Sequence, residues 1–185
     1  LLIGAVVLAI GAIFTDSLPA LIASMIVAPL AYPILGVGLG IAAGSLRLIG
    51  KSLAVLAFSC IIALGIAIAA TALSGNDRRP DILISFNGND HIAFAIAILS
   101  GLIAAYGATK PKVASAITGV AIAVSLVPPL VATGISLAPG GILLPGAPIL
   151  FALNVVGIVC ASSLVFWRMG LGKAYRSHSG SNKYK

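Results

Sequence analysis

The chain has 185 residues, of which 60% are hydrophobic and only 8% are charged, and its formal net charge is +7. A soluble domain carries roughly 25% charged residues, so this composition excludes a water-soluble globular protein and indicates an integral membrane protein. The basic residues are scattered between apolar segments, which disfavours nucleic-acid binding and agrees with their collection on one side of a membrane.

Charged and turn residues divide the chain into six apolar segments. The first, about 1–14, is shorter than the roughly 20 residues of a full span. It starts without Met inside an apolar run, so we expect the chain to be a fragment that begins within a first helix. The second covers 18–46, with Pro19 suited to the first turn of a helix. The others cover about 52–73, 91–109, 113–137 and 147–167. The sequence therefore predicts an all-α, polytopic membrane bundle of about six transmembrane helices.

The charges sort by side when these segments alternate across a membrane. One side receives nine basic residues, namely Arg47, Lys51, Lys110, Lys112, Arg168, Lys173, Arg176, Lys183 and Lys185. The other receives Arg78 and Arg79 and the four acids, Asp16, Asp77, Asp81 and Asp90. Because basic residues collect on the cytoplasmic side, we expect both termini to be cytoplasmic. Residues 1–170 then form the transmembrane domain, and residues 171–185 form a polar, disordered cytoplasmic tail.

Two proline pairs lie deep inside apolar segments. Pro29 and Pro33 lie near the centre of segment two, in MIVAPLAYPILGVGLG, and Pro128 and Pro129 lie past the centre of segment five, in IAVSLVPPLVATG. At an offset of 100 residues, five of nine positions match: Ile22, Ala23, Val27, Pro29 and Leu30 with Ile122, Ala123, Val127, Pro129 and Leu130. Each half, about 1–73 and 91–168, holds three segments, so the second half is inverted in the membrane. Inverted repeats with discontinuous helices are a recurring transporter design, and we predict such a 3+3 repeat with helices two and five broken by proline.

The prolines also remove hydrogen-bond donors at membrane depth. A proline cannot donate to the carbonyl four residues earlier, and an unpaired carbonyl in hydrocarbon costs several kcal/mol. The carbonyls affected are those of Met25, Pro29, Val124 and Ser125. We predict that both breaks meet at mid-membrane and bind a small solute or ion. The candidate lining residues are Ser24, Met25, Pro29, Tyr32, Pro33, Ser125, Pro128, Pro129, Thr133 and Asn154.

Two alternatives to a binding site stay open at these positions. Prolines in membrane helices are commonly plain kinks, which neighbouring helices repair. Asn154, the amide inside segment six, either touches a ligand or joins two helices by hydrogen bonds.

A glycine stripe follows the first proline pair. Gly36, Gly40 and Gly44 recur at four-residue spacing, a small-xxx-small pattern that lets another helix approach closely. We expect these glycines to pack helices, with a partner helix from the same chain or from a second copy.

Several kinds of chemistry have no residues to support them. No acidic residue lies inside a segment, which disfavours a proton relay. The chain has no P-loop, no HExxH and no buried Ser, His and Asp set. We therefore expect no enzymatic activity, no cofactor and no metal centre, although carbonyls and hydroxyls at broken helices suffice to coordinate sodium.

Three stretches resemble the domain-of-unknown-function family 389. DSLPALIASMIVAPLAYPILGVGLG is similar to its first signature, a Ser-containing turn followed by an IIGAM-like run, APL, a second Pro and a glycine-rich continuation. Here Ala23 and Ser24 replace the usual Gly-Ala. TGVAIAVSLVPPLVATG resembles its second signature, and FALNVVGIVCASSLVFW resembles its final helix, including the Asn. The resemblance implies a hydrophobic protein of a prokaryotic cytoplasmic membrane, in a family where many members carry a preceding soluble region, and it brings no substrate.

The residues thus favour a small secondary transporter with its site between segments two and five. A channel-like homo-oligomer, with its pore within or between copies, is one alternative. A structural or sensory membrane module without transport is the other. The expected partners are the lipid bilayer and a small solute or ion, with no nucleic acid.

Overall fold

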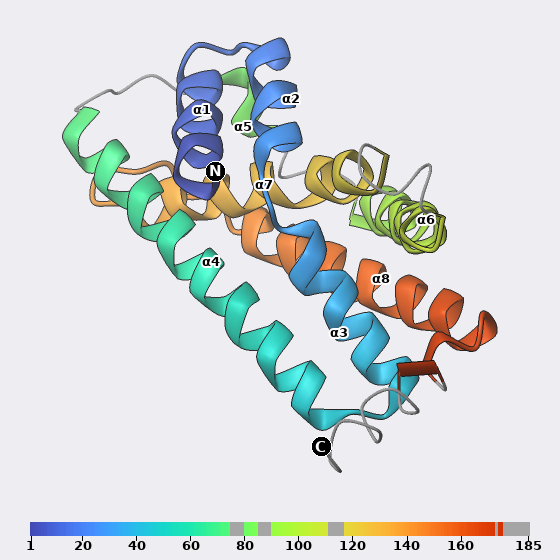
Figure 1. Ribbon diagram of the computed structural model, residues 1–185. Helices are drawn as coiled ribbons and strands as arrows, with labels where there is room; N and C mark the ends of the chain where they lie inside the picture. Colours follow the sequence, from blue (N-terminus) through green and yellow to red (C-terminus); the bar gives the residue numbers. More distant parts are fainter. Residues whose placement is uncertain (75–79, 85–89, 111–116, 173, 176–185) are drawn as a thin grey trace.

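The computed structural model describes residues 1–74, 80–84, 90–110, 117–172 and 174–175, and all secondary structure in these ranges is helical. The helices, shown in Figure 1, are α1 (Leu2–Phe14), α2 (Leu18–Val27), α3 (Ala31–Ala43), α4 (Leu46–Ser74), α5 (Asp81–Ile84), α6 (Asp90–Ala108), α7 (Ile117–Leu137) and α8 (Gly146–Arg168). The prediction of an all-α protein is confirmed. Most of the predicted tail, residue 173 and residues 176–185, lies outside the described residues.

Among the described residues, α4, α6 and α8 are long and apolar enough to cross a bilayer as single helices. The pair α2 and α3 adds a fourth span if the two are counted together. Helix α1 and the Leu126–Leu137 part of α7 are apolar but shorter. The structure thus supports three to four membrane spans, and the predicted count of six is not confirmed.

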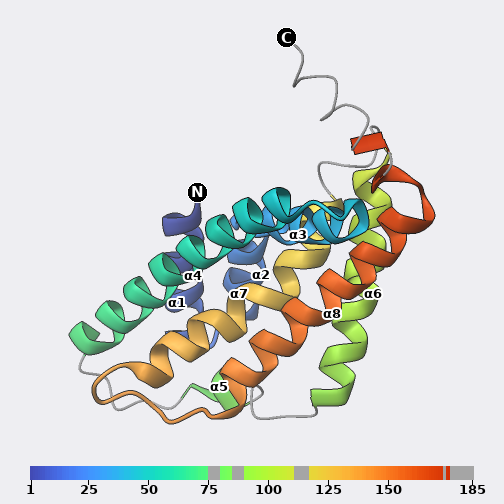
Figure 2. The same ribbon diagram turned by 90° about the horizontal axis from the view of Figure 1, so that it is seen from below.

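Close contacts at glycine show how α6 and α8 lie relative to one another. Gly157 of α8 lies against Ala97 of α6, and Gly101 of α6 lies against Ile158 and Ala161 of α8. Since the residue numbers rise together along both helices, α6 and α8 run in the same direction. Helices α4 and α7 contact each other. Figure 2 shows that both run in the direction opposite to that of α6 and α8. This alternation agrees with helices that cross a membrane in turn.

Helix α3 packs against α4 through two of the predicted glycines. A Cβ atom added to Gly36 would collide with the side chain of Ser52, and one added to Gly40 would lie 2.7 Å from Cγ1 of Ile49. The residue numbers change in opposite senses, so α3 and α4 are antiparallel. The neighbour of this stripe is therefore a helix of the same chain.

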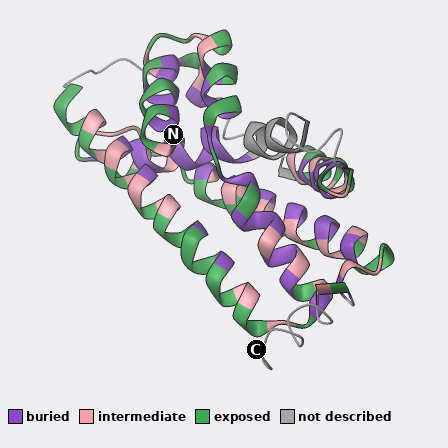
Figure 3. Ribbon diagram, in the orientation of Figure 1, coloured by how far each residue is buried: buried purple, intermediate pink, exposed green. Residues whose placement is uncertain are grey.

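Helix α7 lies at the centre of the bundle. It contacts α1, α2, α3, α4, α6 and α8, and Leu126, Val127 and Val131 are almost fully buried. Helix α4 lies at the periphery and exposes large apolar side chains such as Phe58 and Ile61 (Figure 3). An apolar exposed face of this kind suits contact with lipid tails.

A polar contact ties the short helix α5 to the turn between α1 and α2. The backbone amide of Ile82 donates a hydrogen bond of 3.1 Å to Oδ1 of Asp16. Asp16 has a φ of 50°, a conformation that Asp adopts more readily than most residues. The acid that the sequence places at the mouth of segments one and two therefore positions a neighbouring loop.

The third predicted packing glycine, Gly44, has a different role. It is the C-cap of α3 at φ 61° and ψ 34°, the left-handed conformation, and its amide donates to the carbonyl of Ile41. It is exposed, whereas Gly40 is buried against α4. The four-residue spacing predicted helix packing at Gly44 because it assumed that the helix continues. The helix ends there, and glycine is the usual residue at such a left-handed end.

We predict that Gly44→Ala lowers the free energy of unfolding by about 1–2 kcal/mol, because alanine is disfavoured in the left-handed conformation. Thermal unfolding in detergent measures the change. Gly44→Asn is the matched variant, since Asn tolerates this conformation better than Ala despite its larger side chain. A larger loss for Asn than for Ala would contradict the cap and support close packing instead.

Candidate functional site

The break predicted in segment two lies at residues 28–30. Helix α2 ends at Val27, Ala28 is extended with φ −73° and ψ 124°, and the axes of α2 and α3 differ by 53°. Pro29 explains this geometry locally, because a proline disfavours the helical conformation in the residue before it. Pro33 lies in the first turn of α3, where a helix needs no amide donor. The second proline of the pair is therefore compatible with the start of α3 and does not break it.

The break presents polar backbone groups of both kinds. The last carbonyls of α2, from Met25 to the C-cap residue Ala28, have no following turn to supply their donors. The first amides of α3, at Ala31 and Tyr32, begin a helix whose N-cap residue, Leu30, makes no side-chain capping bond. Helix dipoles give the start of α3 a partial positive charge and the end of α2 a partial negative charge. An ionic or polar group is thus stabilised at either end.

The second predicted break is absent. Pro128 and Pro129 are buried inside α7, which continues through them as one helix over Ile117–Leu137. The φ angle of proline, about −65°, is compatible with a helix, and α7 is packed against α1, α2, α3, α4, α6 and α8. Two internal hydrogen bonds are lost while the helix persists. The prediction that segment five is broken is therefore wrong. The carbonyls of Val124 and Ser125 still lose their helical donors, because Pro128 and Pro129 have no amide hydrogen.

The predicted hydroxyl groups bond within their own helices. Ser24, fully buried, donates a hydrogen bond of 2.6 Å to the carbonyl of Leu21. Thr133 donates one of 2.7 Å to the carbonyl of Pro129. Neither carbonyl is among those that the prolines leave without a donor. The side chain of Ser125 lies outside the described part of the structure.

The remaining candidates divide into a buried and an exposed group. Met25 and Asn154 are buried, at 7% and 5% exposure, as are Pro33, Pro128 and Pro129. Helices α2 and α8 both contact α7, so the elements that carry most of this buried group meet around the central helix. Pro29 and Tyr32 are exposed on the outside of the chain. The structure therefore does not place these two with the buried group.

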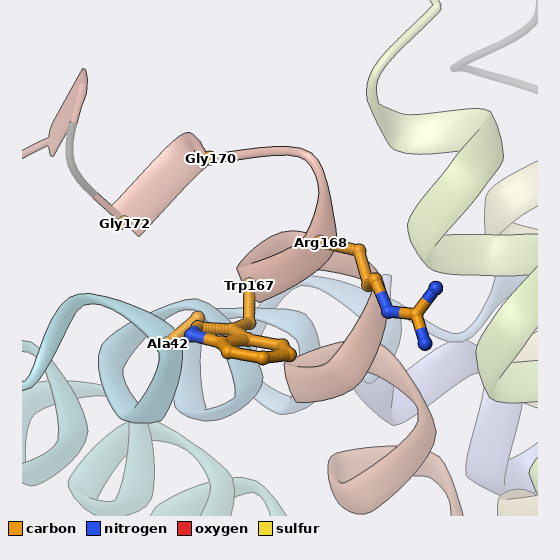
Figure 4. A pocket seen from close by; sticks show the side chains of 5 residues that line it. All are labelled: Ala42, Trp167, Arg168, Gly170 and Gly172. Atoms are coloured by element: carbon orange, nitrogen blue, oxygen red, sulfur yellow. The ribbon is translucent and has the colours of Figure 1, made fainter.

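A pocket that the sequence did not indicate lies at the far ends of α3 and α8. Its volume is about 560 Å³, and it is lined by Ala42, Trp167, Arg168, Gly170 and Gly172. In Figure 4 the Trp167 ring lies beside Ala42, and the Arg168 guanidinium points away from that ring. A Trp-Arg pair at the end of an apolar helix is the signal of a membrane–water interface. In the described ranges, no group of three or more His, Cys, Asp or Glu residues is arranged to hold a metal ion.

Residues 25–160 match the family described as Domain of unknown function (DUF389). The chain belongs to the DUF389 family. The matched region contains the break, the proline pair of α7 and Asn154, and of the residues that line the pocket it includes Ala42 alone.

A relative gives the same assignment. The chain is 31% identical over 173 residues to the uncharacterized protein MJ0678 of Methanocaldococcus jannaschii. This alignment covers 92% of the chain and 53% of the relative, so the DUF389 chain spans about half the length of that protein. No solved structure matches the chain.

Proposed function

We propose that this DUF389 protein is a small secondary transporter whose site lies at mid-membrane, beside the break where α2 packs on α7. The break carries this proposal. Non-helical backbone at membrane depth is tolerated where it is buried in protein or lines a water-filled cavity. The chain ends α2 and restarts α3 within one apolar stretch, with Ala28 extended between them. A transport site is a physical reason to keep such a costly feature.

The chemistry of the break defines the substrate class. The start of α3 favours an anionic or polar group, and the carbonyls at the end of α2 favour a cation. Broken helices in transporters commonly bind a substrate and a coupling ion in this way. The proposed substrate is accordingly a small charged or polar solute, or an ion such as sodium. Binding of this kind requires no enzymatic activity and no cofactor, and we propose none.

The pattern of helix contacts supports an inverted repeat. If α2–α3 corresponds to α7 and α4 corresponds to α8, a twofold axis exchanges the contact of α3 with α8 for the contact of α7 with α4. Both contacts are present. Gly38 of α3 lies against Ser162 of α8, and Gly134 of α7 lies against Ala67 of α4. Each of the two helix contacts is therefore made through a glycine and another small residue. The repeat that we propose has one broken helix, α2–α3, and one continuous helix, α7.

The same arrangement bears on the membrane topology. The ends of α3 and α8 lie together, since Gly172 approaches the backbone of Ala42. Arg168 is the last residue of α8, and Arg47 lies in the first turn of α4, which follows α3 after two residues. Basic residues favour the cytoplasmic side. We therefore propose a cytoplasmic-membrane protein in which this end, and both termini, face the cytoplasm.

One observation favours a second candidate function. Because α7 remains continuous through Pro128 and Pro129, only one of the two proline pairs interrupts a helix. A structural or sensory membrane module, in which prolines shape the bundle without transport, is consistent with that asymmetry.

Charge movement across reconstituted vesicles tests the proposal. Purified protein in proteoliposomes, adsorbed on a solid-supported electrode, is exposed to concentration jumps of sodium, potassium, chloride and small organic anions. We expect a transient current for at least one solute that saturates with concentration and is absent from protein-free vesicles. Unitary currents in planar bilayers would indicate a channel instead. If the protein gives no current and exchanges no radiolabelled solute, the structural module is the better description.

A further inference from the structure

The pocket at the ends of α3 and α8 separates a charge from an apolar wall. It measures about 560 Å³ and is lined by Ala42, Trp167, Arg168, Gly170 and Gly172. In Figure 4 the Trp167 ring lies beside Ala42, whereas the Arg168 guanidinium extends away from that ring, on the side of α6. A compact soluble anion would use only the charged side of this pocket. An amphiphile, which has a charged and an apolar part, would use both sides.

The charge of Arg168 is not neutralised within the described part of the chain. Arg168 is exposed and makes no ion pair with any residue that the structure describes. All four acids of the chain come before residue 91. Asp16 lies at the turn after α1 and Asp81 lies in α5, at the opposite end of the bundle from the end of α8 (Figure 2). The pocket therefore presents a positive charge to which an anion can bind.

A lipid-facing stripe of α8 leads to the pocket. Its members are exposed and recur every three or four residues, so they share one face of the helix; they are Val156, Cys160, Leu164 and Trp167. Since α8 is long and apolar enough to cross a bilayer, lipid tails suit this face. Trp167 ends the stripe at the pocket, and tryptophan is enriched at the level of lipid headgroups. A lipid whose tails lie along the stripe thus has its headgroup beside the pocket.

We propose that this pocket binds the headgroup of an anionic phospholipid. The Arg168 guanidinium donates paired hydrogen bonds to the phosphate oxygens, a geometry that suits arginine. The Trp167 ring packs on the glycerol and the upper tails of the same lipid. A choline group would bring a second positive charge close to Arg168, so an anionic headgroup is preferred over a zwitterionic one. Basic pockets between membrane helices bind anionic headgroups on the cytoplasmic side of other proteins. This inference does not depend on transport, because none of the lining residues belongs to the break.

Fluorescence of Trp167 tests the proposal. Trp167 is the only tryptophan of the chain, so its emission reports on the pocket alone. The protein is reconstituted in vesicles with equal amounts of phosphatidylcholine and phosphatidylglycerol, in which the tails of one lipid or the other are brominated to quench an adjacent indole. We expect brominated phosphatidylglycerol to quench more strongly, with a preference on the order of fivefold for the wild type. Equal quenching by the two lipids would overturn the proposal.

Three variants separate the site from the general charge of the surface. Arg168→Gln should remove the preference, and Arg168→Lys should keep part of it, because lysine retains the charge but not the paired geometry. Lys51→Gln is the matched control. Lys51 is an exposed cation near the start of α4, and no residue of α4 is among those that line the pocket. It should therefore keep the wild-type preference. An equal loss in Lys51→Gln and Arg168→Gln would show that the whole surface, and not this pocket, attracts the lipid.

A soluble phosphate is the other source of the same ligand chemistry. Inorganic phosphate at millimolar concentration, exchanged for chloride at constant ionic strength, should leave the quenching by brominated phosphatidylglycerol unchanged. If inorganic phosphate abolishes the preference, the pocket binds a soluble anion and the lipid proposal is wrong. Since this experiment measures no transport, its failure would leave the transporter proposal untouched.

Discussion

Replacement of Pro29 by alanine should join α2 and α3 into one continuous helix and reduce the transient current to that of protein-free vesicles. Alanine restores the amide that bonds the carbonyl of Met25, and it relieves the restriction on Ala28. Alanine is also favoured over proline inside a helix by about 3 kcal/mol. The polar groups that the break exposes would then bond to one another within the helix. The solid-supported-membrane current measures the loss, and circular dichroism in detergent confirms that the variant is folded.

The second proline pair provides the comparison. Since α7 is continuous, Pro129→Ala should change the current much less than Pro29→Ala. Pro148→Ala is the neutral control, because Pro148 lies exposed in the first turn of α8, where its missing amide has no partner to lose. If the variant with both Pro29→Ala and Pro129→Ala transports like the wild type, the broken-helix site is wrong.

Introduction of a single methyl group at Gly101 should destabilise the bundle more than any surface change. A Cβ atom there would lie 2.8 Å from the Cα of Ile158 and 2.9 Å from its carbonyl oxygen. Both are backbone atoms of α8, so relief requires the two helices to move apart. Overpacking of this kind costs about 1–3 kcal/mol, and helices in lipid depend on close packing for their association. Unfolding of Gly101→Ala in mixed detergent micelles measures the loss of free energy.

Gly65→Ala is the matched control for this experiment. Gly65 lies in the interior of α4, and an added Cβ would have no atom within 4 Å. Alanine is favoured over glycine in a helix by roughly 1 kcal/mol, so this variant should be as stable as the wild type or more stable. Wild-type stability in Gly101→Ala would contradict the close approach of α6 and α8.

Most helix positions could be predicted from the sequence, because long apolar stretches between charges leave helices as the structures that satisfy their own backbone in lipid. The largest error in these positions was the start of α4, predicted at residue 52 and found at Leu46. The prediction stopped at Lys51 because a charge ends a hydrophobic segment. A charged residue does not end a helix, since the side chains of Lys and Arg near a helix end extend to the membrane–water interface.

The sequence by itself predicted that segment two is interrupted at its proline pair, because the effects of Pro29 are local: it lacks a donor, and it restricts the residue before it. Only the tertiary structure decided that Pro128 and Pro129 leave α7 intact, since that outcome depends on the helices packed around α7. It also decided which face of each helix is covered. Tyr32 and Met25 are both close to the break in sequence, yet one is exposed and the other buried. Periodicity identifies the residues that share a face, but only the neighbouring helices decide which face meets protein.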